Sequence, residues 1–189
     1  MFFHLKPHLL NKKPLKTTQG GRFLAVFVLF ITLFLNNFAV AETSKAAFLE
    51  DVFAESAVEK KIWLLGEHKK VVSAILNHPY KQLRVGYWSA KEKPDTRVWF
   101  LQEIGKEKEI DVGIVIYNNR IQKLRILAFR ESRGWEVKLP FFTKQFEQNK
   151  LTVEYTLANQ VSNISGATLS WRAVTKLARV ALYLNKQLP

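Results

Sequence analysis

The spacing of apolar residues predicts helices before and after a region of strands. Between Ala46 and Leu65, apolar residues recur at helical spacing with charged residues between them, which indicates an amphipathic helix. A second, shorter helix is expected from His68 to Asn77, because Pro79 disfavours helical backbone in the residue before it. The final helix follows residue 170 and has the most regular apolar stripe, formed by Val174, Leu177, Ala178, Ala181 and Leu184.

The middle of the chain has the period of β-strands. Leu83 to Trp88 alternates as a strand with one buried face does. Arg97 to Ile104 and Ile110 to Tyr117 are rich in β-branched and aromatic residues and are predicted as further strands. Asn118-Asn119 predicts a two-residue hairpin turn into a strand over residues 120–129, because Asn tolerates the positive φ that such a turn requires.

One more strand is expected at Leu151 to Tyr155, after a turn or short helix around residues 142–148. We see no internal repeat, low-complexity tract or long linker. These elements predict a single α+β domain with a mainly antiparallel sheet flanked by helices. Within it, residues 42–97 would form the N-terminal helical and first-strand part and residues 98–189 the core.

Residues 1–41 have the pattern of a signal peptide. Five basic residues and no acidic residue precede Glu42, and Ala39-Val40-Ala41 supplies small residues at the two positions that a signal peptidase reads. The apolar run from Phe23 to Phe34 spans 12 positions, whereas a membrane-spanning helix needs roughly 20. We therefore expect cleavage after Ala41 and a periplasmic protein; an uncleaved membrane anchor is the alternative.

The charge of the remaining 148 residues favours anionic partners. They hold 24 Lys and Arg against 16 Asp and Glu, a net charge of +8. Such an excess suits phosphate groups, lipid head groups or acidic proteins, and membrane-surface association is one expectation. The basic residues are scattered and do not interleave with aromatic residues as in a nucleic-acid groove. Nucleic acid is therefore not expected as a partner.

The chain contains no cysteine, which excludes disulfides, haem attached through Cys-x-x-Cys-His and thiolate-bound iron–sulfur clusters. Redox work would then need an organic cofactor or a metal with other ligands. His68 and His78 are the only histidines after residue 41, and no third ligand stands at a telling spacing. The sequence also lacks Gly-x-Ser-x-Gly, Gly-x-Gly-x-x-Gly and P-loop motifs.

The segment from Ser165 to Ser170 carries the most specific chemistry. Gly166 and Ala167 let the backbone approach a ligand closely, and free N–H groups at the start of the following helix would attract an anion. The Thr168 hydroxyl could contact a phosphate or be esterified by it. The other interpretation is a helix cap made by these hydroxyl residues, which stabilises by about 1 kcal/mol without any ligand.

Ser165-Gly166-Ala167-Thr168 resembles the flavin attachment motif of the FMN-binding domain family, Asp-x-x-Ser/Thr-Gly-Ala-Thr/Ser. This family occurs in subunits of sodium-pumping and Rnf-type electron-transport complexes and in small exported flavoproteins. The resemblance implies FMN joined to Thr168 through a phosphoester by a separate flavin transferase. It also implies a cofactor site that includes the neighbouring residues Ser165, Gly166, Ala167, Leu169 and Ser170. The chain departs from the motif at the Asp position, which is Ser162, and at Asn163, where Gly is frequent.

A second segment supports the comparison. Residues 129–136 are similar to the Glu-Thr-Pro-Gly-Leu-Gly loop of the complex subunits and to the Glu-Ser-Arg-Gly-Trp-Glu form of small exported members. The resemblance adds to the cofactor site Glu131, Arg133, Gly134 and Trp135. Trp135 could stack on the isoalloxazine, and Arg133 could pair with the phosphate or with reduced flavin. The alternative is a surface turn with Trp135 in the core and an ion pair from Glu131 to Arg133.

A third similarity to the family is weaker. It lies in Glu103-Ile104-Gly105-Lys106, where Lys106 could meet a phosphate. From this resemblance, residues 98–189 are expected to form the FMN-binding core.

Together these features predict an exported flavoprotein that relays electrons between protein partners. The donor would be a membrane-bound oxidoreductase and the acceptor a cytochrome or a terminal reductase. An electron carrier is favoured over a turnover enzyme, because no proton-transfer residue or substrate pocket is identifiable in the sequence. The alternatives are a non-flavinylated exported binding module of the same fold and a flavin-dependent reductase of a small substrate.

Overall fold

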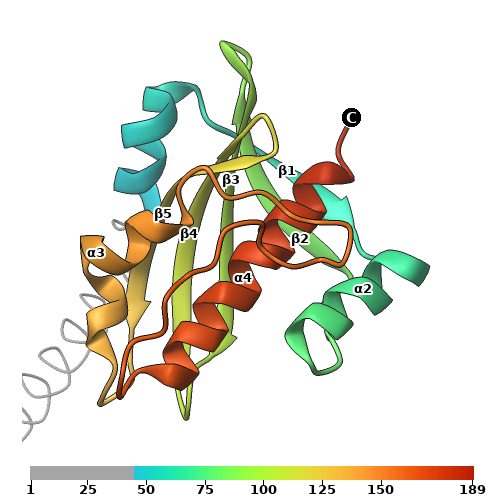
Figure 1. The fold of residues 1–189 in the computed structure, drawn as a ribbon. Coiled ribbons are helices and arrows are strands. Elements are labelled where there is room, and N and C mark those ends of the chain that lie inside the picture. Colours follow the sequence, from blue (N-terminus) through green and yellow to red (C-terminus); the bar gives the residue numbers. More distant parts are fainter. Residues whose placement is uncertain (1–44) are drawn as a thin grey trace, which may run out of the picture. The chain divides into compact units, whose positions relative to one another are not determined.

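The computed structural model describes residues 45–189; the predicted signal peptide, residues 1–41, lies outside the described residues. The described part is an α+β domain built on one five-stranded antiparallel sheet (Figure 1). The strands follow one another in sequence order: β1 (Val58–Trp63), β2 (Arg84–Ala90), β3 (Lys93–Ile104), β4 (Glu109–Tyr117) and β5 (Arg120–Phe129). The predicted fold class is confirmed.

The helical elements lie before, between and after these strands. Residues 45–53 are helical and are followed by a short 3₁₀ turn, η1 (Ala54–Ser56). The others are α2 (Gly66–Leu76), η2 (Trp135–Lys138), α3 (Pro140–Thr143), η3 (Lys144–Phe146) and α4 (Thr168–Lys186). Among residues 45–189, no helix combines the length and the apolar character needed to cross a bilayer.

The core lies between the sheet and α4, which crosses one face of it beside α2 (Figure 1). All five residues of the predicted apolar stripe of α4 are buried, from Val174 to Leu184. They share a cluster with residues such as Trp99 and Ile114 on the covered face of the sheet. Burying large apolar side chains stabilises by about 1.5–3 kcal/mol each, so this layer fixes the position of α4.

The predicted helix from Ala46 to Leu65 is wrong in its second half. The helix stops at residue 53, Ala54 adopts a left-handed φ of 52°, and β1 follows. β1 is an edge strand that pairs only with β2, and most of its side chains are exposed. A strand without a buried face shows no apolar alternation, so the sequence contained no strand signal there.

The predicted strand from Leu151 to Tyr155 is also wrong. Leu151 makes a single bridge to Leu157, and Tyr155 has a left-handed φ of 59°. The chain turns back because the Thr152 hydroxyl and backbone bond with Thr156. Residues 147–167 therefore form a long loop between η3 and α4.

The other element predictions agree with the structure. α2 covers nearly the expected range and ends at Asn77 in left-handed conformation, φ 59°. The hairpin residues Asn118 and Asn119 have φ values of 47° and 57°, as the turn requires. The predicted turn or short helix around residues 142–148 corresponds to α3 and η3.

Asn149 anchors the long loop that leads to α4. Its side chain is fully buried; its amide nitrogen donates to the carbonyl of Asn159, and its amide oxygen accepts from the N–H of Asn159, both at 2.9 Å. Asn149→Ala leaves both backbone groups without these partners and should lower the free energy of unfolding by about 1–3 kcal/mol, measured by urea denaturation. Asn159→Ala is the matched control, because the exposed side chain of Asn159 takes no part in these bonds. An equal loss in both variants would contradict this role.

Candidate functional site

The first turn of α4 begins without a side-chain cap. Ala167 is the N-cap residue, with φ −117° and ψ 21°, and no side chain bonds to the helix start. Thr168 is already the first helical residue, Ser165 is exposed and Ser170 is buried. The helix-cap interpretation of these three hydroxyl residues is therefore wrong.

This turn leaves backbone donors available for a ligand. The N–H of Ala167 donates to the Ile164 carbonyl at 3.0 Å, and the N–H of Trp171 makes the first bond of the helix, to the Ala167 carbonyl at 2.8 Å. Within residues 45–189, the N–H groups of residues 168–170 have no hydrogen-bond acceptor. Uncapped N–H groups at the positive end of a 19-residue helix favour an anion.

A cavity of about 510 Å³ opens at this turn. Its volume lies within the roughly 300–1,000 Å³ of small-molecule sites. It is lined by Lys106, Glu131, Ser132, Arg133, Gly166, Ala167, Thr168, Leu169 and Ser170. The structure thus brings together the two segments that the sequence analysis singled out, together with Lys106 from the turn between β3 and β4.

Three of the predicted site residues, Ser165, Gly134 and Trp135, do not line the cavity. Ser165 is exposed beside it, and Trp135, at the start of η2, exposes 56% of its surface. The interpretation of Trp135 as a core residue is therefore wrong. Its predicted stacking on a flavin would need the ligand to extend beyond the lining residues.

Gly134 holds the two segments in contact. It is buried with a φ of 86°, and a Cβ atom added there would lie 2.9 Å from Ser170 Oγ and 3.3 Å from Ala167 Cβ. The backbone of the loop after β5 therefore lies directly against the first turn of α4. Both the left-handed φ and the lack of space require glycine.

Glu131 ties the same loop to the turn between β3 and β4. One carboxylate oxygen, Oε1, accepts the backbone N–H groups of Lys106, Glu107 and Lys108 at 2.5, 2.8 and 2.9 Å. Gly105 leaves room for it, since a Cβ atom there would lie 2.8 Å from Oε1. The predicted ion pair between Glu131 and Arg133 is not found among the described residues.

The pKa of Glu131 reflects this arrangement. Removal of water from around the carboxylate raises its pKa, but the three backbone hydrogen bonds and the charge of Lys106 lower it more, so the pKa lies below its ordinary value of 4.5. Glu131 is therefore ionised at neutral pH. Its Oε1 atom accepts hydrogen bonds from the β3–β4 turn, and these bonds reduce the repulsion between the carboxylate and an anion in the cavity.

Asn163 contacts the predicted attachment residue, and the sequence analysis did not include it in the site. Its side-chain amide donates to Thr168 Oγ1 at 3.2 Å, while the backbone N–H of Ser162 donates to Gln145 Oε1 at 2.7 Å. The Trp171 indole donates to the Val161 carbonyl at 3.1 Å and anchors this stretch to α4. The sequence marked Asn163 only as a departure from the family motif, because a bond that spans the turn between residues 163 and 168 leaves no periodic signal.

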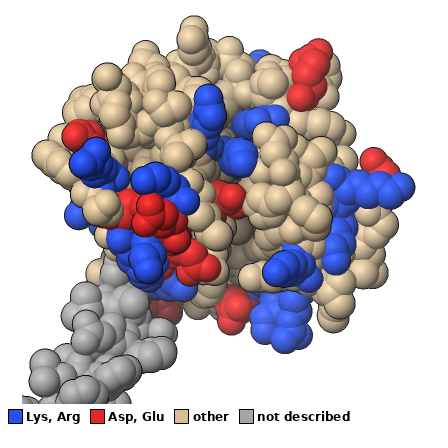
Figure 2. Space-filling model, turned by 90° about the horizontal axis from the view of Figure 1, so that it is seen from below, with Lys and Arg blue, Asp and Glu red and all other residues tan. Residues whose placement is uncertain are grey.

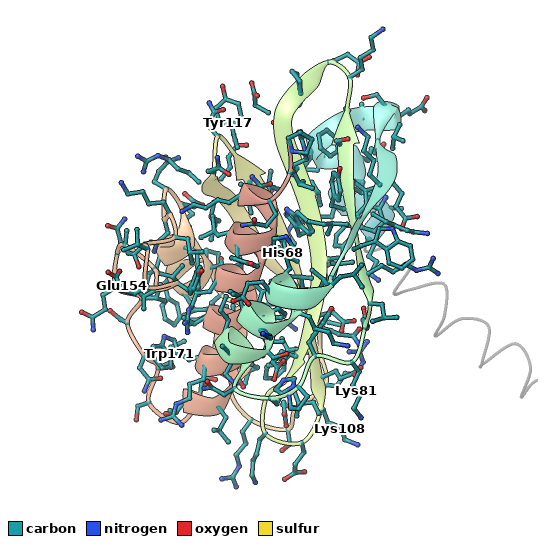
Figure 3. The ribbon with its side chains drawn as sticks, turned by 90° about the vertical axis from the view of Figure 1, so that its right-hand side faces the viewer. His68, Lys81, Lys108, Tyr117, Glu154 and Trp171 are labelled. Atoms are coloured by element: carbon teal, nitrogen blue, oxygen red, sulfur yellow. The ribbon has the colours of Figure 1, made fainter. Side chains whose placement is uncertain are left out.

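The charges around the cavity suit a phosphate. Lys106 and Arg133 line it with two cations, and Arg133 is exposed. Figure 2 views the molecule from the end at which α4 begins, where Lys and Arg side chains lie among Asp and Glu side chains. In Figure 3, Trp171 of α4 and Lys108 of the β3–β4 turn lie toward this same end, with Tyr117 at the opposite one. The cations, the free N–H groups and the Thr168 hydroxyl therefore fit the phosphate of a flavin nucleotide.

His68 and His78 do not form a metal site with other described residues. His68 bonds through Nδ1 to the Tyr183 hydroxyl at 2.9 Å, and His78 bonds through Nε2 to both carboxylate oxygens of Glu103 at 3.0 Å. No cluster of three or more His, Cys, Asp or Glu side chains that could hold a metal occurs in residues 45–189. Two other cavities, of about 600 and 520 Å³, contain none of the predicted site residues.

A comparison with protein families agrees with this site. Residues 105–183 match the model of the FMN-binding domain family. The matched range includes the β3–β4 turn, the Glu131–Trp135 loop and the first turn of α4. The match supports an FMN-binding domain over residues 105–183, with FMN as its cofactor. No curated protein matches the chain.

Two glycines offer a matched test of the contact between the loop and the helix. Gly166 has a φ of 83°, close to that of Gly134, but a Cβ atom there would meet nothing within 4 Å. Gly166→Ala should therefore cost only backbone strain, about 1–2 kcal/mol of unfolding free energy. Gly134→Ala should cost about 1–3 kcal/mol more, because its Cβ overlaps Ser170 and Ala167. Equal costs in chemical denaturation would show that the close contact is absent.

Glu131→Gln should destabilise the domain at neutral pH, because a neutral amide oxygen is a weaker acceptor for three N–H groups. Since the folded-state pKa of Glu131 is lowered, its contribution is complete above the ordinary value of 4.5 and is lost as the pH falls through the folded value. The difference in unfolding free energy between the parent and the variant should therefore shrink below about pH 4.5.

Glu107→Gln is the control for this titration. Glu107 lies in the same turn, but its side chain is 65% exposed and its carboxylate pairs only with Lys106 among the described residues. Its replacement should change the unfolding free energy by less than about 1 kcal/mol. A gap between the parent and Glu131→Gln that stays constant down to pH 3 would contradict the clamp formed by Glu131.

Proposed function

We propose that this chain is an exported electron-transfer flavoprotein whose FMN is joined to Thr168 through a phosphoester. The observation that carries the proposal is the position of Thr168: it is the first residue of α4 and lines the cavity together with Lys106 and Arg133. A phosphate esterified to Oγ1 would start beside the free N–H groups of the first turn. The match to the FMN-binding domain family supplies the cofactor.

The surroundings of Thr168 support attachment by a separate flavin transferase. Among the described residues, the hydrogen-bond partner of Oγ1 is Asn163, whose amide nitrogen donates and cannot accept a proton. A threonine hydroxyl needs a general base to become a nucleophile. Asn163 can orient the hydroxyl but cannot activate it, so the base would come from the partner enzyme. That enzyme would also bring an activated flavin nucleotide, whose phosphorus loses its leaving group as its bond to Thr168 Oγ1 forms, while the base accepts the proton of the hydroxyl.

The residues around the cavity have distinct tasks in electron transfer. Bound FMN would accept and donate the electrons. Arg133 and Lys106 place positive charge at the cavity, which favours the added negative charge of reduction. Glu131 fixes the turn that carries Lys106, and Gly134 fixes the loop that carries Arg133.

An electron carrier suits this site better than a turnover enzyme does. Of the carboxylates and histidines of the described residues, only Glu131 lines the cavity, and its Oε1 atom accepts three backbone N–H groups. Proton transfer to a small substrate therefore lacks an evident donor. The expected partners are a membrane-bound oxidoreductase as donor and a cytochrome or terminal reductase as acceptor, in the periplasm; this location rests on the sequence pattern of residues 1–41.

Thr168→Ala tests the attachment. The protein isolated from its host should contain flavin that survives denaturation and desalting, seen as visible absorbance and as the added mass of FMN. Thr168→Ala removes the attachment oxygen and should lose both signals. Thr168→Ser should keep them, because it retains a hydroxyl at the attachment position, where the family motif accepts either residue.

Two outcomes would contradict this proposal. An unmodified, colourless parent protein from the native host would leave only the non-flavinylated binding module of the same fold. Flavin retained by Thr168→Ala would move the attachment elsewhere. If the flavin is present, faster reoxidation of the reduced protein by small acceptors than by cytochromes would favour the reductase alternative over the carrier.

A further inference from the structure

A second surface lies where β1 passes into α2. Three large apolar side chains are exposed there: Trp63 by 58%, Leu65 by 60% and Leu83 by 52%. We call these three residues the Trp63 patch. Monomeric proteins tolerate single exposed apolar residues, but neighbouring ones often mark an interaction site.

Backbone geometry brings these side chains together. Leu64 is fully buried, so Trp63 and Leu65 on either side of it in extended backbone point outward. The N–H of Leu64 donates to the carbonyl of Leu83 at 2.8 Å, and Trp63 pairs with Arg84 across β1 and β2. Trp63 and Leu83 line one surface hollow together with Gln82 and Arg84.

Positive charge concentrates in the same stretch of chain. Residues 58–84 contain two acidic residues, Glu59 and Glu67, and six basic residues, a net charge of +4. The basic residues are Lys60, Lys61, Lys69, Lys70, Lys81 and Arg84. All of them except the half-buried Lys69 are exposed, and the only ion pair found among them in the described residues joins Lys70 to Glu67 at 3.8 Å.

The position of the Trp63 patch would leave the candidate flavin site free. In Figure 1 the end of β1 and α2 lie at the right, whereas α4 begins at the lower left. Figure 3 faces this right-hand side, with His68 of α2 at its centre and Lys81 toward its lower edge. A partner seated on the Trp63 patch would therefore not cover Thr168.

We propose that the Trp63 patch docks the domain on the surface of an anionic lipid bilayer. Tryptophan favours the level of the lipid head groups, and leucine buries apolar surface below it. Arg84 lines the same hollow as Trp63 and Leu83 and complements anionic head groups, each basic residue near the surface strengthening binding about fivefold. Pairing of β1 with another strand suits the patch less well, because Lys60 and Lys61 on an edge strand oppose it.

Vesicle binding tests the proposal. The protein as isolated from its host should sediment with vesicles of phosphatidylcholine and phosphatidylglycerol at least about tenfold more strongly than with phosphatidylcholine alone, and high salt should weaken this binding. Arg84→Gln should weaken binding to the anionic vesicles about fivefold. Leu83→Ser should weaken it at least about threefold, whereas Val153→Ser, at a residue 86% exposed on the loop before α4, should not.

Brominated lipids locate the contact, because they quench tryptophans that enter the bilayer. Trp63→Phe should remove most of the quenching seen in the parent protein. Trp135→Phe is the matched control, since Trp135 is 56% exposed at the flavin end of the domain, and it should leave the quenching unchanged. This comparison holds whatever residues 1–44 contribute to membrane binding, because they are identical in both variants.

Three results would overturn the proposal. One is equal binding to both kinds of vesicle; another is quenching that survives Trp63→Phe. The third is self-association in analytical ultracentrifugation that Leu83→Ser abolishes without any change in vesicle binding, which would make the patch an interface between copies of the chain. None of these measurements requires bound flavin. The proposals of bilayer binding and of FMN attachment at Thr168 can therefore be contradicted independently of each other.

Discussion

The contact between Gly134 and the first turn of α4 is the constraint on which the candidate site depends. The core places α4 against the sheet, and β5 leads into the loop that contains Gly134. Only where these two meet without a side chain between them can Arg133 and Thr168 line one cavity. Glu131 extends the same arrangement to the β3–β4 turn and adds Lys106. The β3–β4 turn, the loop after β5 and the first turn of α4 are therefore held around the cavity by two features. One is the close backbone contact that Gly134 allows, and the other is the set of hydrogen bonds that Glu131 Oε1 accepts.

The electrostatics of the cavity depend on the absence of a side-chain cap at the start of α4. A side-chain cap would have occupied the first N–H groups of α4 and stabilised the helix by about 1 kcal/mol. The chain instead leaves them free and sets two cations beside them. The carboxylate of Glu131 would oppose an anion, but three backbone donors stabilise its charge and hold its Oε1 atom in the turn. The uncapped first turn of α4 is less stable than a capped one would be, but its N–H groups are available to bind a phosphate.

The sequence predicted those parts of the fold whose residues face a buried layer. The stripe of α4 and the hairpin at Asn118-Asn119 were predictable, because burial and positive φ leave characteristic residues. β1 was not, since an exposed edge strand has no apolar alternation, and the loop after η3 is closed by the side chains of Asn149 and Thr152.

The candidate site also has parts that the sequence predicted and parts that it did not. All three segments that line the cavity were noted in the sequence through a family resemblance, and the match of residues 105–183 to the FMN-binding domain family supports it. Their contact through Gly134, the clamp of Glu131 and the bond from Asn163 to Thr168 depend on how distant backbones meet. No spacing in the sequence encodes those meetings. The same limit applies to the Trp63 patch, which joins residues from β1, the start of α2 and the segment before β2.

The attachment of FMN to Thr168 is tested most directly by phosphorus NMR. The spectrum is recorded between pH 5 and pH 8 on the protein isolated from its native host, after unfolding and desalting. A phosphate monoester gains a second negative charge near pH 6, whereas a phosphodiester has no second proton to lose. A flavin esterified to Thr168 therefore predicts one chain-bound phosphorus resonance whose position stays constant across this range. No phosphorus signal, or a resonance that titrates near pH 6, would contradict attachment at Thr168.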